Sequence, residues 1–126
     1  MDLEQDKQIY TEEQREELIK KEYLKLKRIF GDLPEDRKKI LEGLIQDASF
    51  MHATLDEARL VIRRDGIVEG YQNGASQFGR KKSSYVEVYD KMLNSYAKVI
   101  KQLTEELPTE AKRDAAEDIM RFALKR

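Results

Sequence analysis

Hydrophobic residues near the start of the chain recur in steps of three and four, which predicts a helix over residues 11–30. Its apolar stripe consists of Ile19, Tyr23, Leu26, Phe30 and Leu33. Thr11 followed by Gln14 has the form of a capping box, so we expect the helix to begin there. We expect Gly31 to stop it in the left-handed conformation. Pro34 then opens the next helix, because a missing N–H costs nothing in a first turn.

A second helix, over residues 35–64, has the clearest pattern in the chain. Its apolar positions alternate steps of three and four and are Leu41, Leu44, Ala48, Met51, Leu55, Ala58 and Ile62. Such a narrow seam packs against a partner helix at a small crossing angle. The partner is either another helix of the same chain or a neighbouring subunit, and one seam can serve both in an oligomer. We take Leu44, Met51 and Leu55 as its centre.

The C-terminal part predicts two more helices, over residues 84–107 and 109–125. Ser84 with Glu87 has the form of a second capping box. The apolar stripe of residues 84–107 is Tyr85, Tyr89, Met92, Tyr96, Val99 and Leu103, and its centre is Tyr89, Tyr96 and Leu103. Pro108 interrupts the pattern before the last helix. A stripe at this spacing is more often core than a stacking surface for bases.

Between the helical halves, residues 66–83 lose the helical period. The stretch reads "GYQNGASQFGRKKSS" over residues 70–84. Asn73-Gly74 is a strong signal for a two-residue hairpin turn, and short segments with β-forming residues flank it. We therefore expect a β-hairpin or a basic connector here. The predicted fold class is all-α: one domain, residues 1–126, of about four helices with this insertion, oligomerising through its helical seams.

Composition limits the class of protein. A chain of 126 residues fits one domain. It has no cysteine, which excludes a disulfide framework and thiolate metal sites. The N-terminus "MDLEQDKQIY" is acidic and polar, so it is not a signal peptide, and no apolar run approaches the ~20 residues needed to cross a bilayer. We expect a cytoplasmic protein without membrane contact.

Positive charge concentrates in one part of the chain. The net charge is −1, but residues 63–83 carry five cations and two anions. The cations are Arg63, Arg64, Arg80, Lys81 and Lys82, and Lys125 and Arg126 at the C-terminus are weaker candidates. Three adjacent cations before a helix N-terminus suit contact with DNA phosphates, although an ordinary solvated charge run is commoner. We expect readout of backbone and shape, because no base-reading group is evident.

No catalytic pattern is found. The chain has one histidine, His52, which we interpret as a residue without a role in proton transfer. The glycines near residue 74 lack the spacing of a phosphate-binding loop. The adjacent carboxylates of Asp56–Glu57 and Glu117–Asp118 point about 100° apart on a helix, so we interpret them as solvated faces and not as metal ligands. We therefore predict a protein that is not an enzyme and has no metal or cofactor.

The order of a helical half followed by "GIVEGYQNGASQFGRKKSSYVEVYDKMLNSYAKVIKQLTEELP" resembles the small subunits of tailed-phage terminases. The resemblance covers residues 40–113 and is most specific over residues 66–108. It implies a non-catalytic protein that forms ring-like oligomers, binds viral double-stranded DNA, and recruits the large terminase subunit that holds the ATPase and nuclease. Within it, Gln72 to Gly74 correspond to the turn and residues 80–82 to the connector. The alternative is a helical scaffold that binds another protein and no DNA.

Overall fold

The computed structural model describes residues 9–72, 78–107, 117–118 and 120–121. Its elements are helices α1 (Glu12–Ile29), α2 (Glu35–Asp65) and α3 (Ser84–Glu105), and strands β1 (Val68–Gln72) and β2 (Phe78–Lys82) between α2 and α3. The mostly helical fold and the hairpin insertion that the sequence predicted are therefore confirmed. No described helix is long and apolar enough to span a bilayer.

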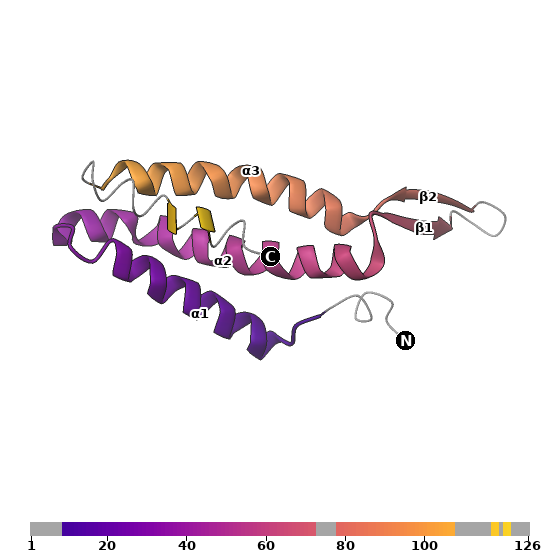
Figure 1. Cartoon of the computed structure of the whole chain (residues 1–126), viewed down its shortest axis with the longest axis horizontal. Helices are drawn as coiled ribbons and strands as arrows, with labels where there is room; N and C mark the ends of the chain where they lie inside the picture. Colours follow the sequence, from indigo (N-terminus) through magenta and orange to yellow (C-terminus); the bar gives the residue numbers. More distant parts are fainter. Residues whose placement is uncertain (1–8, 73–77, 108–116, 119, 122–126) are drawn as a thin grey trace.

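Helix α2 is the centre of the fold. α1 packs along one side of it and α3 along the other, and the hairpin projects past the end of the helices (Figure 1). The described residues form three helices of full length, so a four-helix bundle is not established. Of the predicted helix 109–125, only residues 117, 118, 120 and 121 are described, and these are helical. The remainder of that prediction lies outside the described residues.

The capping residues predicted from the sequence for α1 and α2 are found in the structure, with the exception of Gly31. The Thr11 side chain accepts a hydrogen bond from Gln14 N, and the Gln14 side chain accepts one from Thr11 N, so the predicted capping box is confirmed. Pro34 precedes the first turn of α2, as predicted. Gly31 does not adopt a left-handed conformation, and that prediction is wrong. Among the described residues the positive φ belongs to Gly66, at +83°, where α2 ends.

Helix α3 begins one residue earlier than its predicted cap implies. Ser83 is the N-cap, and its Oγ accepts a hydrogen bond of 3.2 Å from Tyr85 N. The predicted capping box of Ser84 with Glu87 is therefore wrong. Ser84 is already the first helical residue because Ser83 is held in place by the hairpin, through a 2.8 Å bond from its N–H to Ile67 O.

The core lies between the three helices. It consists of Leu26 and Phe30 of α1, Leu41, Ile45, Ala48 and Leu55 of α2, and Tyr96, Ile100, Leu103 and Leu107 in and just after α3. The predicted seam residues Leu55, Tyr96 and Leu103 belong to it. Leu44, Met51 and Tyr89 are half-buried and pack against it. The more deeply buried residues of α2 include Ile45 and Val61, each 2% exposed.

Candidate nucleic-acid interface

The base of the hairpin is fixed to both long helices. The positive φ of Gly66 lets the chain leave α2 directly, and Gly66 N donates a 2.7 Å hydrogen bond to Ile62 O. On the return, Ser83 N bonds Ile67 O and Ser83 Oγ caps α3. Because both strands join a helix within one or two residues, the direction of the hairpin follows from the α2–α3 pair (Figure 1).

The strand register sorts the hairpin residues onto two faces. β1 and β2 are antiparallel, and the pairs run from Val68 with Lys82 to Gln72 with Phe78. Paired residues share a face and neighbours along a strand alternate. The first face therefore contains Val68, Gly70, Gln72, Phe78, Arg80 and Lys82, and the second contains Glu69, Tyr71, Gly79 and Lys81. A two-residue turn at Asn73-Gly74 would pair Gln72 with Ala75, but Gln72 pairs with Phe78, so the prediction of a two-residue turn is wrong. Residues 73–77, between the two strands, lie outside the described residues.

The first face is basic and exposed. Arg80 and Lys82 are both exposed, and Phe78 between them and the tip is 73% exposed. Arg80 stands opposite Gly70, which has no side chain, so its guanidinium has open space across the ladder. Within the described part of the chain, neither Arg80 nor Lys82 forms an ion pair. These two cations are therefore available to an anionic partner.

The second face is compact and close to neutral. Lys81 Nζ lies 3.5 Å from the Glu69 carboxylate, with which it shares a ladder pair. The Tyr71 ring covers Gly79 so closely that a Cβ added there would lie 2.5 Å from the Tyr71 hydroxyl oxygen. The sequence alone groups Lys81 with Arg80 and Lys82, because the three cations are consecutive. Because side chains alternate along a strand, Lys81 points away from Arg80 and Lys82, and it already pairs with Glu69.

The other predicted DNA-contact residues are divided between the end of α2 and the C-terminus. Arg63 and Arg64 are exposed in the last turn of α2, next to the hairpin base. The Arg64 guanidinium forms two hydrogen bonds, of 2.8 and 2.9 Å, to Asp65, so its charge is partly balanced. Lys125 and Arg126 lie outside the described residues.

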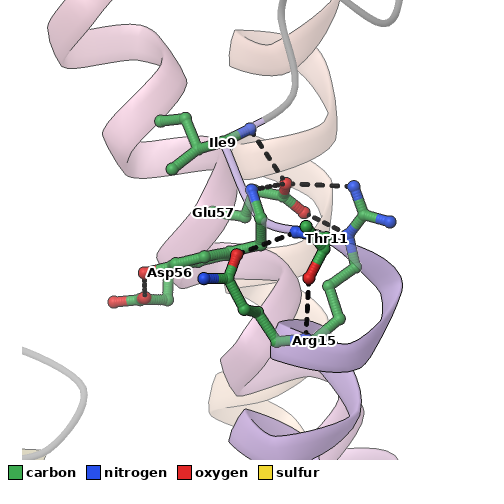
Figure 2. Close-up of polar contacts among 7 residues, drawn as sticks. Ile9, Thr11, Arg15, Asp56 and Glu57 are labelled. Atoms are coloured by element: carbon green, nitrogen blue, oxygen red, sulfur yellow. Dashed lines mark hydrogen bonds and ion pairs between the residues drawn. The ribbon is translucent and has the colours of Figure 1, made fainter.

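Asp56 and Glu57, interpreted above as a solvated face, bind the N-terminal segment to α2. The Glu57 carboxylate accepts hydrogen bonds from Ile9 N, at 3.3 Å, and from the Arg15 side chain (Figure 2). Tyr10 donates twice, from its N–H to Glu57 and from its hydroxyl to Asp56. The solvated-face interpretation is therefore wrong for this pair. Glu117 and Asp118 are exposed, as expected.

These contacts set the protonation of Glu57. Burial by itself raises the pKa of the Glu57 carboxyl, but hydrogen bonds from Arg15, Tyr10 and Ile9 and the Arg15 charge outweigh burial and hold that pKa below its ordinary value. The same contact raises the pKa of the Arg15 guanidinium. Nothing in the sequence pattern marks this cluster, because Tyr10 and Glu57 are 47 positions apart.

Sequence reasoning also missed a buried polar cluster to which all three helices contribute. The Glu22 carboxylate of α1 is 3.5 Å from His52 Nε2 of α2, and Lys25 lies 3.4 Å from the same carboxylate. The Tyr96 ring of α3 lies 6.2 Å from the His52 ring. Burial, and then the charge of Glu22, raises the pKa of Tyr96. His52 is 9% exposed, so it is a core residue that links α1 to α3.

The described surface also has a hollow away from the hairpin. One shallow hollow of about 380 Å³ lies where α1 meets α2, lined by Lys27, Gly31, Glu35, Lys38, Lys39 and Glu42. Lys27 pairs with Glu42 and Lys38 pairs with Glu35 there. The described residues contain no group of three or more His, Asp or Glu side chains suited to a metal ion. Comparison with protein families, curated proteins and solved structures found no match to this chain.

Proposed function

We propose that this protein is the small subunit of a tailed-phage terminase, a non-catalytic component that binds viral DNA in the host cytoplasm and recruits the large ATPase-nuclease subunit. The observation that carries the proposal is the exposed first face of the hairpin, where Arg80 and Lys82 lie side by side on alternate positions of one strand. Arg63 adds an exposed positive charge in the last turn of α2, three residues before Gly66, where the chain leaves the helix for the hairpin. The resemblance over residues 40–113 supports the connection to genome packaging.

The charges predict the strength of binding. Arg80, Lys82 and Arg63 offer about three phosphate contacts per chain, and each contact changes the slope of log K against log salt by about 0.9. One copy therefore binds weakly and in a strongly salt-dependent way. A homo-oligomer presents several hairpins to one duplex, and the effective concentration of the second and later hairpins raises the overall affinity. Self-association is for this reason part of the proposal.

The proposal is tested by measuring DNA affinity across a salt series, from about 50 to about 200 mM, together with the mass of the particle by light scattering. The variant Arg80→Ala with Lys82→Ala is compared with the wild type. We expect its salt slope to fall by about two for each hairpin engaged. Both residues are exposed, so the variant should retain its helical circular dichroism and its melting temperature.

The matched control is Lys81→Ala with Glu69→Ala. It removes an ion pair from the second face and leaves the net charge unchanged. We expect its salt slope to equal that of the wild type. A monomeric protein with no salt-dependent DNA binding would contradict the proposed function. If the salt slope of DNA affinity is the same in both variants, the protein binds DNA but not through the first face of the hairpin.

A scaffold that binds another protein is the second candidate, and one observation favours it. Ile40 and Phe50 on α2 are 64% and 53% exposed although both are large and apolar. Exposed apolar residues on a central helix suit a protein contact. If Ile40→Ser with Phe50→Ser leaves DNA affinity unchanged but abolishes capture of the large subunit, both activities belong to one protein. If DNA binding is absent altogether, the scaffold is the better description.

A further inference from the structure

The first face of the hairpin carries more than positive charge. Gln72 pairs with Phe78 at the outer end of the described ladder, and Arg80 follows two positions along the same strand. All three are exposed. An amide, an aromatic ring and a guanidinium therefore lie together on one side of a two-stranded ribbon, and Lys82 follows nearer the helices. The two-residue turn that the sequence predicts would pair Gln72 with Ala75 and would put Phe78 on the opposite face, so the sequence alone does not bring these residues together.

Each of the three side chains matches a group on a base edge. Glutamine can form two hydrogen bonds to adenine N6 and N7, arginine can form two to guanine O6 and N7, and phenylalanine packs on the methyl group of thymine. Residues two apart on a strand are spaced by about 6.6 Å, which is close to two base-pair steps of 3.4 Å. Phe78 and Arg80 can therefore contact bases about two steps apart.

The width of the ribbon selects the groove. Two paired strands are about 4.8 Å apart between backbones, and their side chains add to that width. The major groove is about 12 Å wide and admits a two-stranded ribbon, whereas the minor groove is about 6 Å wide. Gly70, which lacks a side chain opposite Arg80, leaves the ribbon thin at its middle pair. Lys82 is nearer the helical body, where it can contact the phosphates at the groove edge.

We infer that the hairpin enters the DNA major groove and that Gln72, Phe78 and Arg80 contact base edges there, with a preference for a site containing A·T and G·C pairs in a fixed order. The inference rests on the proposed function, because it assumes that the chain binds double-stranded DNA. It replaces the readout of shape alone that the sequence suggested with direct contact to bases.

The test begins with competition on a duplex of mixed sequence. Methyl green occupies the major groove and netropsin the minor groove. We expect saturating methyl green to weaken binding by more than about tenfold, because it blocks all three base contacts and the loss of one good contact alone costs about tenfold. We expect netropsin to leave the affinity unchanged. A duplex enriched from a random pool is then prepared with uracil in place of thymine. Loss of the methyl groups should reduce the affinity of the wild type but not of Phe78→Ala.

Variants separate base contact from charge. Gln72→Ala and Phe78→Ala keep every charge, so each should lower the preference for the selected duplex over a random one by about tenfold while leaving the salt slope unchanged. Tyr71→Ala, on the second face, is the matched control and should retain the preference. Phe78 is 73% exposed, so its removal should not affect folding.

The possible failures are distinguishable. If the wild type binds no DNA at any salt concentration, the proposed function fails, and this inference fails with it. If the wild type binds DNA in a salt-dependent way but netropsin displaces it and methyl green does not, the proposed function stands and the major-groove inference is overturned. The inference is also overturned if Gln72→Ala and Phe78→Ala both keep the full sequence preference.

Discussion

The Arg15 guanidinium meets the Glu57 carboxylate through two hydrogen bonds, from Nε at 2.7 Å and from a terminal nitrogen at 3.1 Å. This ion pair joins the first turns of α1 to the C-terminal half of α2. The same carboxylate accepts the N–H groups of Ile9 and Tyr10. One side chain therefore holds both α1 and the segment before it against the central helix (Figure 2).

Glu57→Ala should lower the free energy of unfolding by about 2 kcal/mol, because it leaves the partly buried donors of Arg15 and Tyr10 without their charged acceptor. Urea unfolding followed by circular dichroism measures the change. Asp47→Ala, at an exposed position of the same helix, is the control and should change stability by less than about 0.5 kcal/mol. Equal effects of the two substitutions would contradict the role of Glu57.

Stability should also fall in acid through Glu57. Because its folded pKa is below the ordinary value of 4.5, its contribution is complete above that pH and is lost as the pH falls through the folded pKa. The free energy of unfolding should therefore drop more steeply below pH 4.5 in the wild type than in Glu57→Gln, which has no carboxylate to protonate. If the free energy of unfolding falls equally steeply in acid in the wild type and in Glu57→Gln, then Glu57 is not responsible for the loss.

Local signals in the sequence predicted the helices and the hairpin, since a cap such as Thr11 or a stop such as Gly66 acts within one turn. The roles of particular side chains could not be predicted from the sequence, because they depend on contacts that only the fold brings together. The acidic pair at residues 56 and 57 appears solvated until Tyr10 and Arg15 are brought to it from more than 40 positions away. Consecutive cations appear equivalent until strand parity puts Lys81 on the opposite face from its neighbours.

Tyr71 and Gly79 form a pair that a small substitution should disrupt. A Cβ at Gly79 would lie 2.5–2.6 Å from the hydroxyl oxygen and two ring carbons of Tyr71, so Gly79→Ala should displace the ring. Tyr71 is 44% exposed and can move, so we expect a change in stability below about 1 kcal/mol. In the wild type the ring current should shift the Gly79 Hα resonance upfield. That shift should disappear in Gly79→Ala and in Tyr71→Leu, and its absence from the wild type would contradict the pairing.

The width of the buried face of α2 leads to a last prediction. The predicted seam passes through Leu44, which is half-buried, whereas the neighbouring Ile45 is only 2% exposed, because α2 is covered by α1 on one side and α3 on the other. A helix buried on two sides has no single stripe that its period can identify. Ile45→Ala should therefore cost about 3 kcal/mol and Leu44→Ala about 1 kcal/mol in urea unfolding under dilute conditions. If Leu44 also lies in a subunit contact, its substitution should become more destabilising as protein concentration rises, while the effect of Ile45→Ala should not. A larger loss for Leu44→Ala at every concentration would show that α2 is rotated relative to the packing described above.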